Sequence, residues 1–388
     1  MKKSLEDIKL TLFFTGGMSL GKWKEIGNLD RELAVYHRIA GKIKKVNLVT
    51  YGGSNDRKFA GEIGRLGLIP AKWHNRQKLT ALHLILRYFP VLIGSDVLKT
   101  NQIRGAQIPV WLKRVFNKRL IVRCGFLHSY FTRQQTGDEK RIEDAVALER
   151  LAFKEADLAV VTSGWQRDLI VEGYGLDPAR VKVIPNYVES DVFKPDPGAE
   201  KKYDLLFVGR GDRQKNLINL LKALEQLHKD GRTVSLMLAG SCSRNIELKQ
   251  LIEKKGLKVQ LQDHLPNYEL PGAINQAKIF ILPSLYEGHP KILLEAMSCG
   301  AACIGTDVVG INDLIDHLEN GYLCRTDYKS LAGAIAEVLN NEDLREKMGR
   351  KARDHVVRHF DIEKVLQLEL EALIELISLQ NKKVFIKK

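Results

Sequence analysis

The sequence predicts an α/β protein built from two doubly wound, Rossmann-like domains that face a central cleft. Three observations lead to this prediction. Short apolar runs alternate with longer segments of helical period, which is typical of parallel βαβ units. The chain has 388 residues, and because a typical domain has about 150 residues, two domains are expected. A segment rich in proline and charge, 187–203, interrupts the periodic pattern and is predicted to be a linker.

The first predicted domain, 1–186, begins with an apolar run that leads into a glycine-rich turn. Its expected strands are 8–14, 45–51, 120–124, 158–163 and 181–186, and its expected helices are 28–41, 139–155 and 164–173. The second domain, 204–358, repeats the alternation with strands at 204–209, 234–240, 259–263, 279–284 and 301–306 and helices at 214–229, 244–255, 268–276, 290–298, 310–316 and 328–340. We expect the last segment, 359–388, to form a helix that packs back on the first domain.

The formal net charge of +14 is concentrated in the first third of the chain. Residues 1–137 carry 25 Lys and Arg against 8 Asp and Glu, whereas the remainder carries 36 against 39. Such a basic surface suits nucleic acid, an anionic membrane or a phosphorylated substrate, although it could also serve solubility alone. The segment 99–119 mixes cations with apolar residues and could rest on an anionic bilayer or bind a phosphorylated lipid. No recognisable nucleic-acid module accompanies it, so no nucleic acid is expected as a partner.

The five cysteines form no CxxC pair and no cluster with zinc-like spacing, which favours a reduced, cytoplasmic protein without a catalytic thiol. The N-terminal apolar run is short and is interpreted as a strand, not as a signal peptide. The most apolar stretch, 79–98, is interrupted by His83, Arg87, Pro90 and Asp96, so no membrane-spanning helix is expected. Any membrane contact would be peripheral, on the inner face of the membrane.

The segment 283–300, PSLYEGHPKILLEAMSCG, has the pattern of a strand, a tight turn and a helix. Pro290 suits the first turn of that helix and Gly300 suits its end. The helix N-terminus would provide an anion site. Glu287 before the helix and Glu295 within it are suited to accept hydrogen bonds from sugar hydroxyls on either side of a diphosphate. The alternative is that Glu287 caps the helix and Glu295 is solvated.

A second segment, VGRGDRQKN at 208–216, follows the first strand of the second domain and opens a helix. Arg210 and Lys215 place two cations beside a glycine-rich turn that includes Gly209. This arrangement can hold a diphosphate and neutralise it as it leaves. A purely structural turn is the alternative.

Together, these segments resemble family 4 glycosyltransferases, which have the GT-B fold. The first resembles the E-x7-E element of that family, the second its G-R…K-N/G element, and 181–195 its passage into the linker. The resemblance covers about 140–340 well and covers the first 130 residues only in architecture. It implies a nucleoside-diphosphate sugar donor and a glycan or lipid-linked acceptor. The implied donor-binding residues are Gly209, Arg210, Lys215, Leu265, Glu287, Gly288, His289, Lys291, Ile292 and Glu295.

The implied roles follow the same resemblance. Arg210 and Lys215 would stabilise the leaving diphosphate, Glu287 would hold the sugar and Glu295 the ribose. Because these groups would supply the positive charge, we expect no metal and no cofactor. The chain departs from the family at Gly288-His289-Pro290, since Pro290 has no N–H to donate to the sugar. His289 or Lys291 could contribute there instead.

The acceptor side is less defined by the sequence. Gly16 and Gly17 follow the first strand and could let the backbone approach a phosphate, or could simply form a tight turn. Arg123 and His128 lie in RCGFLHS, near where the family often places a histidine. A core or surface histidine is the alternative reading of His128.

The sequence therefore predicts a glycosyltransferase, with retention carried over from the family, in assembly of a cell-surface polysaccharide or lipopolysaccharide-type glycan. The alternative is a non-catalytic protein of the same fold that binds nucleic acid or an anionic surface.

Overall fold

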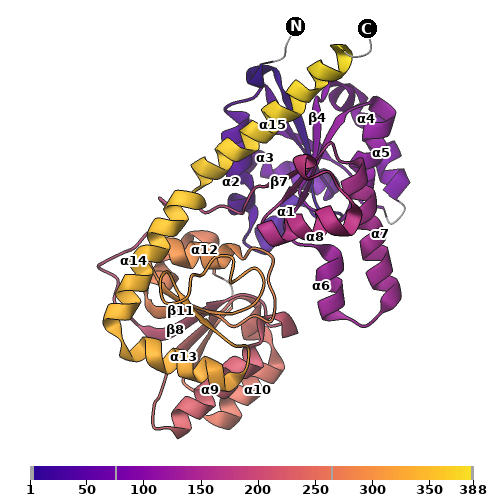
Figure 1. Cartoon of the computed structure of the whole chain (residues 1–388). Helices are drawn as coiled ribbons and strands as arrows, with labels where there is room; N and C mark the ends of the chain where they lie inside the picture. The colour runs from indigo at the N-terminus through magenta and orange to yellow at the C-terminus, as the bar shows by residue number, and fades with distance from the viewer. Residues whose placement is uncertain (1–3, 75–76, 264, 386–388) are drawn as a thin grey trace. The chain divides into compact units, whose positions relative to one another are not determined.

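The computed structural model describes residues 4–74, 77–263 and 265–385, and the chain divides into two compact units. Unit 1 comprises Met1–Pro185 with Leu366–Lys388, and unit 2 comprises Asn186–Val365. The C-terminal segment thus belongs to the same unit as the N-terminus (Figure 1).

In the described part of unit 1, a seven-stranded sheet has only parallel pairs. The strands are β1 (Lys9–Phe13), β2 (Lys45–Thr50), β3 (Gly67–Pro70), β4 (Val97–Thr100), β5 (Arg119–Cys124), β6 (Leu158–Val161) and β7 (Val181–Val183). Their order is β3-β2-β1-β4-β5-β6-β7. The helices are α1 (Leu20–Glu25), α2 (Leu29–Ala40), α3 (Ala60–Ile63), α4 (Gln77–Gly94), α5 (Gln107–Phe116), α6 (His128–Gln135), α7 (Glu139–Glu155) and α8 (Gly164–Tyr174).

In the described part of unit 2, a six-stranded parallel sheet has the order β10-β9-β8-β11-β12-β13. Its strands are β8 (Tyr203–Val208), β9 (Leu236–Ala239), β10 (Val259–Gln262), β11 (Ala277–Leu282), β12 (Ala302–Thr306) and β13 (Tyr322–Cys324). Its helices are α9 (Leu217–Lys229), α10 (Ile246–Lys255), α11 (Leu270–Asn275), α12 (Lys291–Ser298), α13 (Tyr328–Asn340) and α14 (Glu342–His359). The prediction of two Rossmann-like parallel sheets is confirmed.

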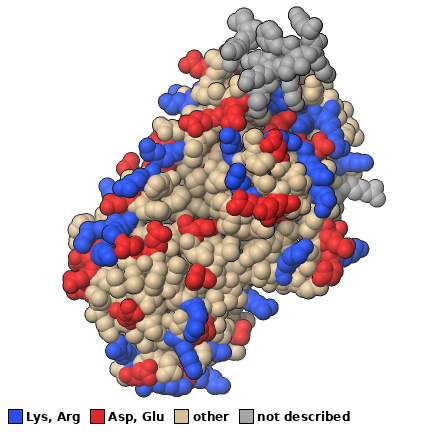
Figure 2. Space-filling view, viewed as in Figure 1, with Lys and Arg blue, Asp and Glu red and all other residues tan. Residues whose placement is uncertain are grey.

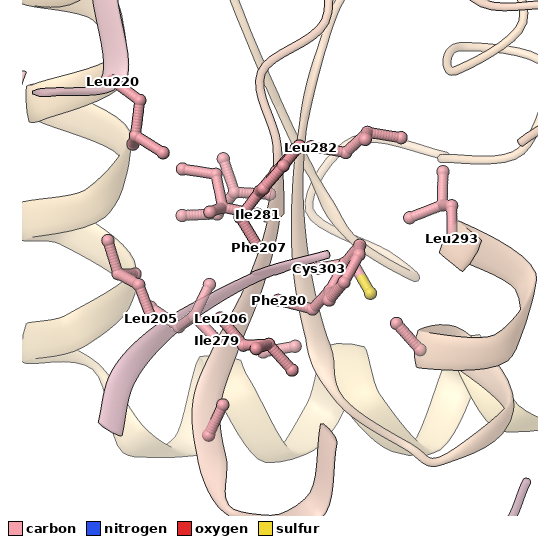
Figure 3. Close-up of a cluster of buried hydrophobic side chains, with 14 of the residues drawn as sticks. Leu205, Leu206, Phe207, Leu220, Ile279, Phe280, Ile281, Leu282, Leu293 and Cys303 are labelled. Carbon is pink, nitrogen blue, oxygen red and sulfur yellow. The ribbon is translucent and has the colours of Figure 1, made fainter. Parts of the chain in front are cut away.

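The core of unit 2 is centred on β8 and β11, whose runs of apolar residues are buried on both faces. In Figure 3, Leu220 of α9 lies on one side of these strands and Leu293 of α12 on the other. Both side chains are fully buried. Helices on both faces explain why central strands of a parallel sheet are continuously apolar.

The predicted linker, 187–203, differs in the structure. Its first half is packed into unit 2, because Tyr187, Val188 and Phe193 are buried there. Val188 also forms a bridge with Asp361: its N–H donates to the carbonyl of Phe360, and its carbonyl accepts from the N–H of Ile362. The prolines and charges of this segment therefore belong to an irregular segment whose first half packs on unit 2, and not to an exposed linker.

Some short elements were not predicted. The strands β3, β4 and β13 have only three or four residues each, too few for a periodic signal. The predicted helix at 310–316 is a series of turns. The helix α4 contains Pro90 and has a non-helical residue, Tyr88, where it kinks.

The C-terminal helix, α15 (Ile362–Phe385), extends from unit 2 into unit 1. Glu369 accepts a hydrogen bond from the Lys99 ammonium at 2.5 Å and pairs with Arg123 at 3.3 Å. All three side chains are buried. Burial opposes ionisation of Glu369, but the two cations outweigh it and lower the pKa of its carboxyl. This buried triad ties α15 to β4 and β5.

Each sheet reverses its strand order at one place, between β1 and β4 in unit 1 and between β8 and β11 in unit 2. In doubly wound sheets, ligands bind beyond the carboxyl ends of the strands at such switch points. The loops that follow these four strands are therefore where a site is expected.

Candidate functional site

The loop after β8 is held in a compact turn by close backbone packing. A Cβ at Gly211 would lie 2.9 Å from the Cα of Cys242, and a Cβ at Gly240 would lie 2.6 Å from the carbonyl oxygen of Gly209. The loop ends at Asn216, which has φ +55° and precedes α9. Its side-chain amide donates to the carbonyls of Pro283 and Thr326. This ties the loop after β8 to the loop after β11.

The loop after β11 is fixed in turn by a neighbouring glycine. The backbone N–H of Glu287 donates to the carbonyl of Val309. Gly310 has φ +85°, and a Cβ there would lie 2.6 Å from the carbonyl oxygens of both Glu287 and Gly288. Only glycine fits this position. The sequence reasoning missed Gly310, although its place in DVVGIND was within the segment resembling the family.

The two loops bring Lys215 and Glu287 together. The Lys215 ammonium lies 2.5 Å from one Glu287 oxygen, with the two side chains 11% and 8% exposed. The same oxygen accepts from the Ser284 hydroxyl at 2.7 Å, and the other accepts from the Gln214 amide at 3.2 Å. Gln214 and Ser284 were not predicted as site residues, although both lie inside the two motifs. The Glu287 carboxylate is thus held by a cation and two neutral donors.

Arg210 lies at the rim of this network. Its guanidinium pairs with Asp212 at 3.1 Å and donates to the Gln214 side chain at 3.2 Å. The Arg210 side chain is 65% exposed. Both cations have a carboxylate partner, but Lys215 is buried whereas Arg210 is exposed, so Arg210 is the more accessible cation for an anionic ligand.

The helix α12 begins just after Glu287, with Pro290 as its N-cap. The N–H groups of a first helical turn have no partner within the helix, and the dipole there favours an anion. Lys291, in this first turn, lies over the ring of Tyr187 at 5.6 Å. Ile292 packs against the core of unit 2. This end of α12 therefore combines a lysine with a helix N-terminus.

Two predicted donor-site residues are buried. His289 is 6% exposed, and its ring meets that of Phe360 at a centroid distance of 5.4 Å. Its carbonyl accepts from the Asn186 amide. Glu295 is 1% exposed on α12, so the alternative that it is a solvated surface residue is wrong. Leu265 is partly buried and packs against the core, while its neighbour His264 lies outside the described residues.

The predicted acceptor residues of unit 1 do not form one site. The indole of Trp73 covers Gly16, where a Cβ would lie 2.6 Å from the ring, and it also borders Gly17. Close packing against Trp73 thus requires glycine at position 16, and the positive φ of +76° favours glycine at position 17. The structure places the Arg123 guanidinium, predicted beside an acceptor, in a buried position against Glu369 and the carbonyl of Ile184. Glu369, which is distant from Arg123 in the sequence, thus holds its guanidinium in place.

His128 does line a cavity in unit 1, together with Arg104 and Arg141. Burial lowers the pKa of His128 from its ordinary 6.5, and the two arginines add to this effect against the carboxylate of Glu149. Neither arginine was predicted, because the cavity joins the loop after β4 with α7.

The cysteines are all free and buried. Burial raises the pKa of Cys242 to about 11 and that of Cys299 to about 12, so both thiols stay protonated at neutral pH. Among the described residues, no group of three or more His, Cys, Asp or Glu side chains is placed to hold a metal ion. In the same part of the chain, no helix is both long and apolar enough to cross a membrane.

Two family models match the chain in succession. Residues 40–187 match the model of a glycosyl transferase 4-like domain, and residues 189–355 match that of glycosyl transferases group 1. The boundary between the two matches falls beside the boundary between the two units.

Individual relatives agree with these matches. The chain is 29% identical over 255 residues to the α-maltose-1-phosphate synthase of Mycolicibacterium smegmatis, covering 58% of this chain and 64% of that protein. It is 29% identical over 200 residues to a Campylobacter jejuni α-1,4-N-acetyl-D-galactosaminyltransferase that is named for a GalNAc-containing, diphosphate-linked undecaprenol acceptor. That match covers 50% of this chain and 55% of the relative. The chain thus spans less than two thirds of the length of both curated relatives.

The fold matches a solved structure over nearly all of the chain. HepE from Anabaena, in complex with UDP and glucose, superposes with a TM-score of 0.76 at 16% identity, covering 94% of this chain and 99% of that one. This likeness shows the GT-B architecture.

Proposed function

We propose that the chain is a GT4-type glycosyltransferase, which moves a sugar from a nucleoside-diphosphate sugar to an acceptor hydroxyl. The two glycosyltransferase family models that match 40–187 and 189–355, together with the GT-B fold, support this proposal. The observation that carries this proposal is the buried Lys215–Glu287 pair at the switch point of unit 2, beside the N-terminus of α12. A carboxylate can accept hydrogen bonds from sugar hydroxyls, and the cations beside it can bind a diphosphate.

The charges of the site suggest which residues bind the diphosphate and which bind the sugar. Glu287 neutralises Lys215, so we expect a diphosphate to be bound by Arg210, Lys291 and the first turn of α12. When sugar hydroxyls donate to Glu287, the Lys215 ammonium can turn toward the phosphates. Charge developing on the leaving diphosphate would then be stabilised by groups already in place. Glu295 is proposed to hold the ribose.

This proposal is tested by sugar transfer with a panel of UDP-, GDP- and dTDP-sugars. Glu287→Gln and Arg210→Gln should each lower kcat/KM by about 100-fold or more, as loss of a charge-stabilising group does elsewhere. Lys249→Gln, on α10 and outside the site, is the matched control and should keep full activity. Full activity in both site variants would contradict the proposal.

Three finer points belong to the same proposal. We expect retention of the anomeric configuration, which the NMR coupling of the product's anomeric proton would report. We expect activity to survive EDTA, because the cations of the site replace a metal. We also propose that the acceptor is a glycan on a membrane lipid, within cell-surface glycan assembly, and that the enzyme acts on the cytoplasmic side. The diphosphate-linked acceptor of the Campylobacter relative supports the choice of acceptor.

Contact with an anionic membrane is proposed for α4, in place of the segment 99–119. In that segment most apolar side chains are buried, including Ile108, Val110 and Leu112. Along α4, by contrast, exposed apolar residues recur every three or four positions at Leu79, Leu82, Leu86, Phe89 and Ile93. Leu86 is 77% exposed.

The charge around this stripe favours an anionic partner. The helix α4 contains Lys78 and Arg87 but no Asp or Glu. The helix α5 also lacks Asp and Glu, although its Lys113 and Arg114 pair with Asp157 and Glu155. Figure 2 shows Lys and Arg side chains grouped over the part of unit 1 that carries α4 and α5. Apolar side chains with basic neighbours are typical of helices that lie on anionic bilayers.

Sedimentation with vesicles tests the contact. The wild-type protein should bind vesicles containing about 30% phosphatidylglycerol and not pure phosphatidylcholine vesicles. Leu82→Gln with Leu86→Gln should abolish most of this binding. Ile246→Gln, which removes an isolated exposed apolar residue of unit 2, is the control and should bind like the wild type. Equal binding to both kinds of vesicle would contradict the proposal.

A further inference from the structure

Unit 1 contains two adjoining cavities with different linings. The first has a volume of about 590 Å³, and its charged lining consists of Arg104, His128, Arg141 and Asp144. The second has a volume of about 380 Å³, and its lining is mostly apolar. The apolar side chains lining it are Ala81, Ile108, Val110, Trp111 and Leu151. The two cavities share Gln77, Gln107 and Leu151, so they form one depression. We call the end with Arg104 and Arg141 the cationic end and the end with Trp111 the apolar end, although Lys78 and Arg114 also line the latter.

The cationic end lies at the switch point of the sheet. The loop after β4 carries Arg104, and its carbonyl accepts from the N–H of Gly16 in the loop after β1 at 2.7 Å. A Cβ at Gly105 would lie 2.9 Å from the nitrogen of Gly16, so these loops are pressed together. Arg104 is thereby positioned where a doubly wound sheet binds ligands.

The cations at this end are available to a ligand. Among the residues that the structure describes, Arg104 and Arg141 have no ion-pair partner. Both act on His128, whose pKa they help to lower after the larger effect of burial. Asp144 is the one carboxylate in the lining, so two guanidinium groups face one negative charge. This surplus of positive charge fits a phosphate or diphosphate, which guanidinium groups bind through paired hydrogen bonds.

The carboxylate of Glu149, which also acts on His128, is hydrogen-bonded to other groups. Glu149 is fully buried and accepts from the backbone and the hydroxyl of Ser129 and from the hydroxyl of Tyr174. It therefore holds the start of α6 in place beside α7. Its partners fix the wall that carries His128 and leave the two arginines unpaired.

The apolar end makes a purely hydrophilic phosphate a poor fit. Trp111 and Ile108 of α5 face this depression with Ala81 of α4. The outer side of α4 carries the exposed apolar stripe described above. An apolar chain that leaves a membrane beside α4 would therefore find further apolar surface leading toward Arg104.

We propose that this depression binds a phosphorylated amphiphile, with the phosphate or diphosphate at Arg104 and Arg141 and the isoprenoid or acyl chain against Trp111. The inference rests on the proposed function, because it assigns this ligand as the lipid phosphate that carries the acceptor glycan. It names the binding site and the chemical class of that acceptor.

Calorimetric titration of the full chain tests the site with three probes: farnesyl diphosphate below its critical micelle concentration, inorganic diphosphate, and farnesol. Farnesyl diphosphate should bind at least about tenfold more tightly than either other probe, since it alone engages both ends. Arg104→Gln and Arg141→Gln should each weaken it about tenfold or more, as expected for a charge-assisted hydrogen bond. Arg133→Gln, an exposed arginine of α6 outside the lining, is the control and should not weaken it.

Two further variants show where farnesyl diphosphate binds. Trp111→Ala should weaken farnesyl diphosphate but not inorganic diphosphate, with the melting temperature checking that the variant folds. Arg210→Gln, which alters the anion site of unit 2, should leave farnesyl diphosphate binding unchanged. Equal affinity for farnesyl diphosphate and inorganic diphosphate, or equal loss in Arg133→Gln and Arg104→Gln, would overturn the inference.

A parallel titration with UDP separates this inference from the proposed function. UDP binding without farnesyl diphosphate binding would overturn the inference and leave the proposed function standing. Farnesyl diphosphate binding that depends on Arg104, in a protein that binds no nucleotide, would support the site and contradict the proposed donor chemistry.

Discussion

The two switch points of this molecule handle charge in opposite ways. Between β8 and β11, Lys215 and Glu287 neutralise each other inside a network that also uses Gln214 and Ser284. Between β1 and β4, Arg104 borders a cavity and has no ion-pair partner in the described part of the chain. In the paired site, between β8 and β11, Lys215 and Glu287 stabilise each other and must exchange this contact for contacts with a ligand on binding. An unpaired site is held by its surroundings and gains its counter-charge from the ligand.

The largest effect expected from this difference is on stability. Lys215→Met should lower the free energy of unfolding by about 3 kcal/mol, because it leaves the Glu287 carboxylate buried without its cation. Arg104→Gln, in the unpaired site, should change stability by no more than about 0.5 kcal/mol. Urea denaturation measures both. Adding Glu287→Gln to Lys215→Met should recover part of the loss, and equal costs for Lys215→Met and Arg104→Gln would remove the distinction.

The rigidity of the paired site is tested at Gly310. Gly310→Ala should cost about 2 kcal/mol, because its φ is positive and the new Cβ would meet two backbone carbonyls that cannot move independently. It should also impair donor binding, since those carbonyls belong to Glu287 and Gly288. The control is Gly333→Ala on α13, where a Cβ meets nothing within 4 Å. That change should stabilise the helix by about 0.5–1 kcal/mol, and thermal unfolding distinguishes the two.

The smallest expected effect is a pH dependence from the unpaired site. The pKa of His128 is lowered in the folded protein, mainly by burial. The unfolded chain therefore takes up this proton first as the pH falls through 6.5, and stability decreases until the folded pKa is passed. Arg104, Arg141, Asp144 and Glu149 are the charged groups around the ring.

This effect is measured as the change of unfolding free energy between pH 7.5 and pH 5. One proton allows a slope of at most about 1.4 kcal/mol per pH unit, and His128→Gln should reduce the slope. The contribution of His355, whose pKa is lowered in the same direction, remains as an internal reference. An unchanged slope in His128→Gln would show that the ring does not titrate as its surroundings imply.

How far the sequence could predict these sites depends on where each partner lies in the chain. The fold and the loop after β11 were predictable, because a buried strand, a turn and a proline-led helix are adjacent in sequence. Lys215 and Glu287 were selected separately, and the structure brings them together. Their roles in donor binding stay predictions until the variants are measured.

The misplaced residues share a physical cause. Arg123 was assigned to an acceptor site, but the carboxylate that binds it is 246 residues further along the chain. For Gly16 the sequence left a phosphate turn and a plain tight turn open, and in the structure Trp73 fills the space beside it. Arg104 and Arg141 were overlooked, since neither belongs to a local motif and the cavity exists only after α7 packs beside the loop after β4.

The buried triad of Lys99, Arg123 and Glu369 also bears on the order in which the chain can fold during synthesis. The carboxylate lies 270 residues after Lys99, so nearly the whole polypeptide leaves the ribosome before the two cations receive their counter-charge. All of unit 2 is made in the interval. Although domains generally fold in the order of their synthesis, the N-terminal sheet here cannot reach its final ionic state until the last helix has emerged. Unit 1, whose synthesis begins first, therefore completes its buried ionic contacts after unit 2 has been made.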